Sequence, residues 1–282
     1  MRRRAVICLL ICGLGLAPGP AAAQTPGASH DQIIERGWIS FGVYEDFPPY
    51  SWSENGAVLG TDVELGYLIA EALGVEARFR AVGADETVDD DLRNHVWKGP
   101  LIGGDVVNVM LHVPYDRELA IRNEMVVLTG LYMTETVAIA YREQAYPDGG
   151  PTPAYFRFDT VGVENDSLAD FYLSSLAGGQ LIPNMRRFAT PSAAMAALRS
   201  GDVSAVMGAR AQLEHGLAEG LALHQPPLPG LAIGQWIVGV AVRHTYRQLG
   251  YAVDGAIQAA VEDGRLAAIF ESYGLAWQAP SW

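Results

Sequence analysis

The sequence has 282 residues, of which 50% are hydrophobic and 18% are charged, and its 19 basic and 32 acidic side chains give a formal net charge of −13. This hydrophobic content excludes a largely disordered chain, and the length is ample for two domains with buried cores. The acidity argues against binding to nucleic acid or to an anionic lipid surface, because both would require clusters of lysine and arginine.

The first 23 residues predict a cleavable secretory signal peptide. Three arginines at positions 2–4 precede the apolar stretch 5–16, which is too short to span a bilayer, and an A-x-A cleavage site lies at 21–23. Both cysteines, Cys8 and Cys12, lie in this segment, and the large residue before Cys12 argues against a lipoprotein signal. We therefore expect a mature periplasmic protein of 259 residues that starts near Gln24, with no disulfide, no lipid, no membrane insertion and a formal charge of −16.

The first half of the mature chain predicts a strand–helix–strand unit. Residues 38–43 have the pattern of a strand, and a loop rich in aromatic residues and proline follows at 44–52. Thr61 and Glu64 match a capping box at the start of a helix that ends at Gly74. Residues 75–81 then alternate between apolar and charged side chains, which is typical of a strand. Such a unit indicates a parallel sheet.

The rest of the chain repeats this pattern. An apolar run at 105–113 and a second at 137–141 predict strands, and the Pro/Gly-rich stretch 147–153 predicts a loop near a domain boundary. Two helices are expected to start at Ser167 and Thr190, and Gly201 ends the second. Further strands are predicted at 160–163, 203–207 and 237–242, and two helices close the chain. The pattern favours two α/β lobes.

Five motifs, in this order, resemble the periplasmic solute-binding proteins of ABC transporters, amino-acid-binding type (solute-binding protein family 3). The resemblance covers about residues 37–274, and this chain is similar to an atypical subgroup. It rests on the order and spacing of Glu45–Tyr50 with Gly56–Gly74, Val109–Arg117, Val161–Ser167, Ala194–Val206, and Val240–Arg243 with Asp263–Gly274.

The resemblance implies a type II periplasmic binding protein, in which two Rossmann-like lobes are joined by two hinge strands and close on a ligand. Lobe one would comprise residues 35–139 and 238–282, lobe two residues 142–234, and the hinge strands would lie near 138–141 and 236–240. The implied function is capture of a small carboxylate-bearing solute for an inner-membrane ABC permease, by a monomer without enzyme activity.

The resemblance also assigns candidate ligand-binding residues. Arg117 matches the arginine that clamps the ligand carboxylate, although a surface arginine paired with Asp116 or Glu118 is the alternative. His112 lies where relatives have a small hydroxyl residue, and it either faces the cleft or is a core histidine with its hydrogen bonds satisfied. Phe47 matches the stacking aromatic residue. Further candidates are Tyr44 and Trp52, which with Phe47 and Tyr50 would wall the pocket, and Asp166 and Ser167 at the predicted helix start in lobe two.

Two departures from the family keep other functions open. Ala209 lies near the position where relatives carry the aspartate that holds the ligand ammonium, and because no carboxylate is available there, α-amino acids should bind poorly. The segment 85–105 differs from typical members and is similar to a subgroup that accompanies quinoprotein-dependent alcohol oxidation in the periplasm. The alternatives are therefore an accessory protein of such a system, or an enzyme similar to cyclohexadienyl dehydratase with Glu45 or Asp46 as general acid.

No cofactor or metal site is predicted from the sequence. The six histidines show no metal-ligand spacing such as H-x-x-x-H, and no nucleotide-binding or nucleophile motif occurs. The three aspartates at 89–91 lack the alternating oxygen ligands and the glycine of a calcium loop. We expect them to start or cap a helix.

Overall fold

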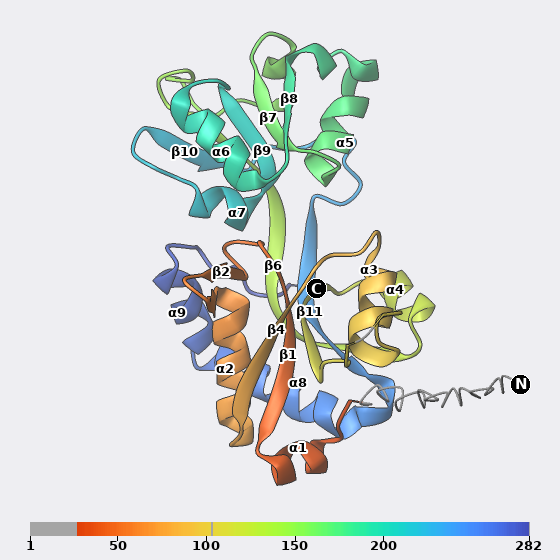
Figure 1. Cartoon of the computed structure of the whole chain (residues 1–282). Helices are drawn as coiled ribbons and strands as arrows, with labels where there is room; N and C mark the ends of the chain where they lie inside the picture. Colours follow the sequence, from red (N-terminus) through yellow and green to blue (C-terminus); the bar gives the residue numbers. More distant parts are fainter. Residues whose placement is uncertain (1–26, 103, 282) are drawn as a thin grey trace, which may run out of the picture.

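Two α/β lobes make up the computed structural model, which describes residues 27–102 and 104–281. They lie one above the other in Figure 1, joined by two long strands, and this arrangement confirms the predicted fold class. The predicted signal peptide lies outside the described residues. Within them, no helix has the length and apolar character that a membrane span requires.

Lobe one contains a mixed sheet in the order β4-β1-β5-β11-β6, in which β1 pairs in parallel with β4 and β5. The strands β11 and β6 complete it in antiparallel register. The elements of this lobe are α1 (His30–Arg36), β1 (Trp38–Tyr44), β2 (Trp52–Glu54), β3 (Ala57–Leu59), α2 (Thr61–Leu73), β4 (Glu76–Val82), α3 (Val88–Leu92), a π-helical turn (Arg93–Trp97), β5 (Val109–Pro114), α4 (Arg117–Arg122), a 3₁₀ turn (His244–Tyr246), α8 (Arg247–Glu262) and α9 (Arg265–Ser272).

Lobe two is built on the continuation of the same sheet, in the order β6-β9-β7-β8, with β10 paired to β6. The strands β7, β8 and β9 are mutually parallel, as expected for strands connected by helices. Its elements are β7 (Val161–Glu164), α5 (Leu168–Ser175), β8 (Met185–Phe188), α6 (Pro191–Ser200), β9 (Ala205–Ala209), α7 (Arg210–His215), β10 (Leu221–His224) and 3₁₀ turns at Pro153–Arg157, Leu176–Gly179 and Ile182–Asn184.

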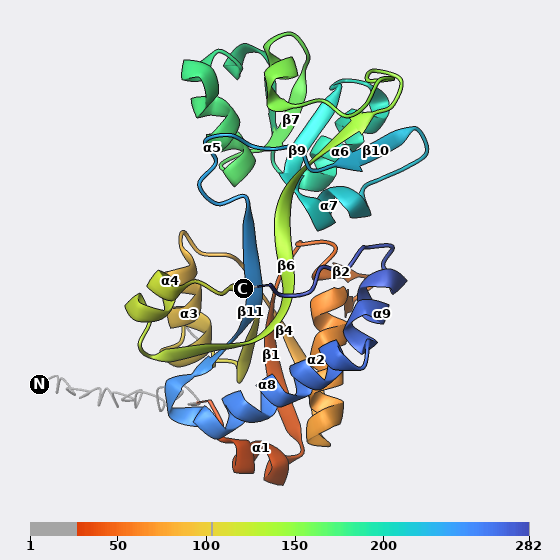
Figure 2. The same cartoon turned by 180° about the vertical axis from the view of Figure 1, so that it is seen from behind.

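The two lobes are connected by β6 (Val126–Arg142) and β11 (Gln235–Arg243), which run side by side between them in Figures 1 and 2. The strand β6 pairs with β11 as far as Thr136 and with β9 from Val137 onward. One strand therefore changes partners between two adjacent residues as it passes from one lobe to the other. The predicted residue boundaries of the lobes stay a prediction, and this change of partner is the structural landmark nearest to them.

Local sequence signals account for most helix ends. Ser167 caps α5 and Thr190 caps α6 through their side chains, and Gly74 and Gly201 end α2 and α6 in the left-handed conformation, all as predicted. The predicted capping box at Thr61 is wrong, because the N-cap of α2 is Gly60 and no side chain caps it. The free backbone N–H groups of this helix start donate instead to carbonyl oxygens of the preceding loop.

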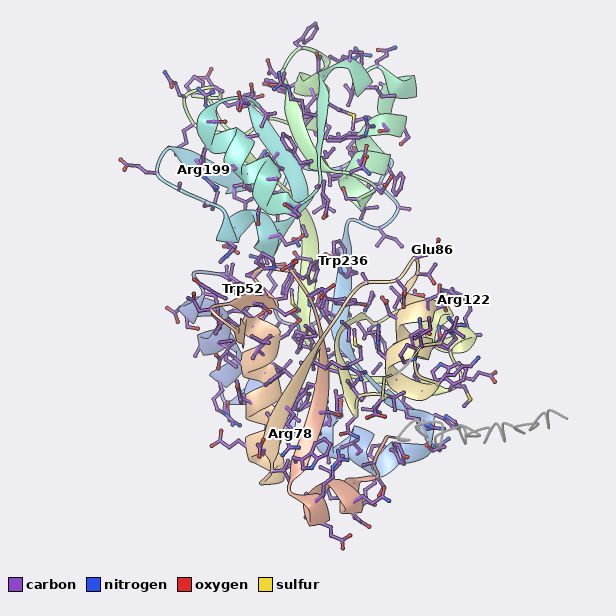
Figure 3. The ribbon with its side chains drawn as sticks, in the orientation of Figure 1. Trp52, Arg78, Glu86, Arg122, Arg199 and Trp236 are labelled. Atoms are coloured by element: carbon purple, nitrogen blue, oxygen red, sulfur yellow. The ribbon has the colours of Figure 1, made fainter. Side chains whose placement is uncertain are left out.

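Each lobe has its own apolar core. In lobe one, α2, α8 and α9 cover one face of the sheet, and a smaller cluster that includes Leu92, Val96 and Val107 lies under the segment from α3 to β5. In lobe two, two clusters lie on the two faces of the sheet. Figure 3 shows Trp52 and Trp236 at the level where the lobes face each other. Trp236 packs against the main apolar cluster of each lobe, so the two cores come close to each other at this level.

Gly60 is required by the tight approach of two backbone segments. Its φ is +128°, and a Cβ atom there would overlap the backbone of Tyr50. We expect Gly60→Ala to lower the free energy of unfolding by about 2–4 kcal/mol, through strain and displacement of the loop. Gly56→Ala is the matched control, because Gly56 has φ +82° with nothing within 4 Å. Its cost should be limited to about 1–2 kcal/mol. Urea unfolding measures both, and equal losses would refute the packing argument.

Candidate functional site

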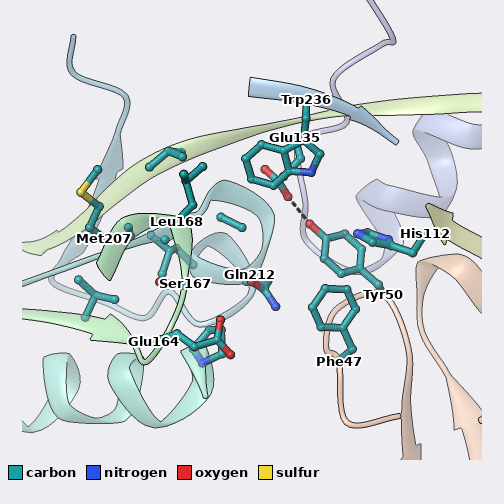
Figure 4. A pocket seen from close by; sticks show the side chains of 17 residues that line it. Phe47, Tyr50, His112, Glu135, Glu164, Ser167, Leu168, Met207, Gln212 and Trp236 are labelled. Carbon is teal, nitrogen blue, oxygen red and sulfur yellow. Dashed lines mark hydrogen bonds between the residues drawn. The ribbon is translucent and has the colours of Figure 1, made fainter. Parts of the chain in front are cut away.

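A cavity of about 260 Å³ lies between the lobes and takes side chains from both (Figure 4). Phe47, Tyr50 and His112 come from lobe one, and Ser167, Met207 and Gln212 are among those from lobe two. Glu135 and Trp236 come from the two connecting strands. This volume is close to the lower end of small-molecule sites, roughly 300–1,000 Å³. A solute held here would contact both lobes at once.

Three rings in mutual contact, tilted or edge-on to one another, form the wall on the side of lobe one. Phe47 and Tyr50 belong to the loop that follows β1, and their ring centroids are 5.0 Å apart. The imidazole of His112 lies 4.0 Å from the Tyr50 ring and 5.0 Å from the Phe47 ring, measured between centroids. The wall is therefore aromatic, with one ring that carries nitrogen donors and acceptors.

A β-bulge directs His112 towards the cavity. In the pairing of β5 with β11, Met110 lies opposite Ala241 and Val113 opposite Gly239, so two residues of β5 face one residue of β11. His112 is the second of these two, and its φ is +58°, an uncommon conformation for a residue other than glycine. Bulges of this kind change the direction of a side chain on a strand. The side chain is 10% exposed.

A buried carboxylate holds the His112 ring in place. The Nδ1 atom of His112 lies 3.1 Å from Oδ2 of Asp62, and the Tyr132 hydroxyl donates to the other oxygen of Asp62 at 2.7 Å. Asp62 has no exposed surface and lies in the first turn of α2, where a negative charge is stabilised. Because Nδ1 is used by Asp62, Nε2 is the ring nitrogen left to meet a ligand. This arrangement suits either ligand binding or proton transfer.

Glu135 joins three segments around the cavity. Its carboxylate is 1% exposed and accepts hydrogen bonds from the Tyr50 hydroxyl, from the backbone N–H of Thr136 at 2.7 Å, and from the backbone N–H of Ala211 at 3.4 Å. Burial, together with the adjacent Glu135 charge, raises the pKa of Tyr50 well above its usual value, so the phenol stays a donor. Ala211 is on α7 of lobe two, so this carboxylate bridges the lobes.

The wall on the side of lobe two contains a second carboxyl group. Glu164 is the last residue of β7, at the carboxyl edge of the parallel strands, where open α/β sheets bind ligands. Burial raises its pKa, so its protonated form is favoured relative to an exposed glutamate. Nearby, the hydroxyl oxygen of Ser167 accepts a hydrogen bond from the backbone N–H of Asp170 at 3.2 Å. None of the described side chains that line the cavity is a lysine or an arginine.

The structure brings together only part of the predicted site. Phe47, His112 and Ser167 line the cavity, whereas Tyr44, Trp52, Asp166 and Arg117 do not. The Tyr44 hydroxyl donates to Asp91 at 2.7 Å, and the ring of Trp52 contacts those of His215 and Tyr273, at 5.7 and 5.9 Å between centroids.

The other two candidates lie at the surface. Asp166 is exposed with a φ of +59°, and Arg117 is exposed as the first residue of α4. Glu45 and Asp46, the acids named for the enzyme alternative, are exposed as well, and neither lines the cavity.

Sequence reasoning also missed four polar or aromatic lining residues, namely Glu135, Glu164, Gln212 and Trp236. Among the described residues, the carboxyl groups that line the cavity are thus Glu135 and Glu164, whereas Glu45 and Asp46 were the only ones named from the sequence. The position of Glu164 at the end of a predicted parallel strand was a usable signal. No comparable signal marks Glu135, which lies in the middle of a 17-residue strand. The absence of an aspartate at Ala209, which does line the cavity, thus does not by itself disfavour an ammonium group.

We expect Glu164→Gln to raise the stability of the protein at pH 7. Because burial raises the pKa of Glu164, the folded state binds a proton more tightly than the unfolded state. The stability of the wild type therefore falls as the pH rises from about 4.3, the pKa of a glutamate in the unfolded chain, towards the raised pKa in the folded state. Glutamine carries no such cost. The gain should appear at pH 7 and vanish below about pH 4, measured by urea unfolding. The exposed Glu86→Gln controls for loss of one negative charge. The same gain at both pH values would contradict this account.

Comparison with known proteins supports the fold. The family model described as "Bacterial extracellular solute-binding proteins, family 3" matches residues 39–96, and this match confirms the resemblance drawn from the sequence. A search of curated protein sequences finds no match. Similar solved structures include an ancestral cationic amino acid solute binding protein, AncCDT-1, with a TM-score of 0.70, 18% identity, and coverage of 87% of this chain and 99% of that one.

Two further structures are similar over the same extent. A mutant of ArgBP from T. maritima has a TM-score of 0.58 and 23% identity, covering 86% of this chain and 98% of its own. A second structure of AncCDT-1, described as a precursor of cyclohexadienyl dehydratase, has a TM-score of 0.60 and 20% identity, covering 88% and 100%. At these identities the likeness establishes the fold alone, with the two-lobed arrangement of periplasmic binding proteins.

Proposed function

We propose that this protein is a periplasmic solute-binding protein that closes its two lobes on a small molecule and delivers it to an inner-membrane ABC transporter. The observation that carries the proposal is the cavity between the lobes, with an aromatic wall from lobe one and polar groups from lobe two. A ligand that contacts both walls stabilises the closed state by its differential affinity for it. The two connecting strands supply the hinge for such closure.

The similar proteins support this proposal through what they are described as binding. The matched family consists of extracellular solute-binding proteins, and the structures include binders of cationic amino acids and of arginine. Periplasmic location and a permease partner follow for this chain if it works as those proteins do. The predicted signal peptide and the acidic mature chain accord with export and with free diffusion in the periplasm.

The solute that we propose bears a carboxylate, as the sequence predicts. Burial raises the pKa of Glu164, and an anion bound beside it would raise that pKa further, so uptake of one proton on binding would turn this carboxyl group into a hydrogen-bond donor to the ligand. Glu135 already accepts three hydrogen bonds within the protein. Arg117 lies five residues beyond His112, at the start of the helix that follows β5, and lobe closure would have to bring its side chain to the cavity.

Phe47→Ala should weaken binding of the solute by at least about tenfold, because it removes an aromatic wall from an enclosed site. The ligand is first identified by mass spectrometry of small molecules released when the freshly purified protein is denatured. Calorimetric titration then compares wild type with the variant. Tyr251→Ala is the control, because Tyr251 is 75% exposed on α8. Equal affinity for all three proteins would place the binding site elsewhere.

Arg117→Ala tests the carboxylate separately. If closure brings the guanidinium onto the ligand anion, its removal should cost about 2–5 kcal/mol, or roughly 30-fold or more in Kd. Arg117→Lys should recover only part of the affinity, because an ammonium group cannot form the bidentate fork. The same calorimetric titration with the identified ligand measures both. Unchanged affinity in Arg117→Ala would make Arg117 a surface residue and leave the cavity as the site.

A second candidate, an enzyme on the same scaffold, is favoured by one specific observation. His112, oriented by Asp62, and Glu164, with its raised pKa, both line the cavity and could act as base and acid on opposite sides of a substrate. The experiment is incubation of the purified protein with prephenate or arogenate, followed by assay for an aromatic product. Product formation that is lost in Glu164→Gln would replace solute binding by dehydration as the function. Without product in the wild type, this candidate fails.

A further inference from the structure

A cluster of three possible metal ligands lies in lobe one, outside the cavity. One ligand atom from each of Asp85, Asp91 and His95 lies within 4.8 Å of the other two. Asp91 is 3% exposed, whereas Asp85 is at the surface, so the cluster opens to solvent on one side. None of these residues lines the cavity between the lobes. The solute-binding proposal does not use them.

Local backbone geometry places the three side chains together. Asp85 lies in the loop between β4 and α3, and Asp91 lies in α3. The chain then continues from α3 directly into the π-helical turn that carries His95. The wider turn brings His95 back towards the loop before the helix. The carbonyl of His95 also accepts the N–H of Val107 at 2.7 Å, which fixes the turn to the segment before β5.

The imidazole of His95 supplies an independent observation that points to a ligand. Its Nε2 atom is buried and has no hydrogen-bond partner among the described residues. The nearest carboxylate oxygen, Oδ2 of Asp85, is 4.0 Å away, which is too far for a hydrogen bond. Ligand atoms that lie about 2.0–2.2 Å from a tetrahedral zinc ion are roughly 3.3–3.6 Å apart, so the exposed Asp85 side chain would move about half an ångström closer when the ion binds. A buried acceptor without a partner is costly, and a bound cation would satisfy it.

Each carboxylate of the cluster is oriented by a neighbouring donor. The hydroxyl of Tyr44 donates to Oδ2 of Asp91 and the backbone N–H of Asp85 donates to Oδ1, both at 2.7 Å. The side-chain amide of Asn94 donates to Asp85 at 2.8 Å. Outer hydrogen bonds of this kind orient the ligands in metal sites.

The local charge also permits a cation. Arg80 opposes a second positive charge, but its guanidinium donates to the carbonyl oxygen of Asp105, and the two aspartates face the site. An imidazole with two carboxylates matches Zn²⁺, whereas Ca²⁺ takes oxygen ligands alone.

We propose that Asp85, Asp91 and His95 bind one divalent transition-metal ion of the zinc type, with water completing the coordination. The ion would tie the loop after β4 to α3 and the π-helical turn, so its role is structural. This proposal is independent of what the cavity binds. A metal that binds only the folded state raises its melting temperature.

The test uses the full mature chain without an affinity tag, stripped of metal and titrated with ZnCl₂ by calorimetry and by thermal melting. We expect binding of one ion per chain and a higher melting temperature. His95→Gln should weaken binding by at least about tenfold and abolish the thermal shift. His30→Gln is the matched control, because His30 also lies beside an aspartate, Asp31, but at the surface and without a third ligand.

A second variant keeps the test decisive if His95→Gln does not fold. Asp85→Asn changes an exposed side chain and retains an oxygen that can accept from Asn94, so it should fold and still lose zinc. The proposal is overturned if the wild type shows no saturable binding. It is equally overturned if His95→Gln or Asp85→Asn, once folded, binds zinc as tightly as the wild type, since the ion would then lie elsewhere.

Discussion

The buried carboxylate of Glu135 is the constraint on which the region between the lobes depends. It lies in β6 immediately before the residue where this strand changes partner from β11 to β9. A carboxyl group with 1% exposure is tolerated only when hydrogen-bond donors of the protein replace the lost water. Those donors come from the aromatic loop of lobe one, from the strand itself and from α7 of lobe two. The hydrogen bonds to this one carboxyl group therefore hold together the three segments that enclose the cavity.

The need to satisfy buried carboxyl groups also determines which side chains of the cavity can contact a ligand. The hydroxyl of Tyr50 donates to Glu135, and its ring contacts those of Phe47 and His112. If Tyr50 turned towards a ligand, the buried carboxyl of Glu135 would lose one of its hydrogen-bond donors. His112 is held in a similar way, because its Nδ1 faces Asp62. The side-chain groups left to meet a solute therefore include one ring nitrogen of His112, the carboxyl of Glu164 and the amide of Gln212. A rigid wall in lobe one thus faces more adaptable polar groups in lobe two.

What could be predicted from the sequence follows the range of the interactions involved. The ends of α5 and α6 depend on neighbours within four residues, and Ser167, Thr190 and Gly201 predicted them correctly. The start of α2 depends on the carbonyl groups of Pro49 and Tyr50, each twelve residues before its donor, and there the capping-box prediction failed. Only residues 137–141 of β6 were predicted as a strand, because polar residues interrupt its earlier part. His112 was singled out by family resemblance and lines the cavity, but its bulge is set by the register with β11, which no local pattern encodes.

Tyr44 shows why a residue can be conspicuous in the sequence without contacting the cavity. It was predicted as part of the pocket wall, yet burial and the neighbouring Asp91 raise the pKa of its phenol, and its hydroxyl donates to that carboxylate. Its ring lies against Phe47, 5.8 Å between centroids, and its carbonyl accepts from Ser51 at 2.6 Å. The tyrosine therefore fixes the loop that carries Phe47 and Tyr50 to the Asp85–Asp91–His95 cluster. A change of rotamer at Tyr44 would strip a donor from a nearly buried aspartate, so the cluster restrains the aromatic wall through a chain of direct contacts. A change in the position of Asp91 would therefore be transmitted through Tyr44 to Phe47 in the cavity wall.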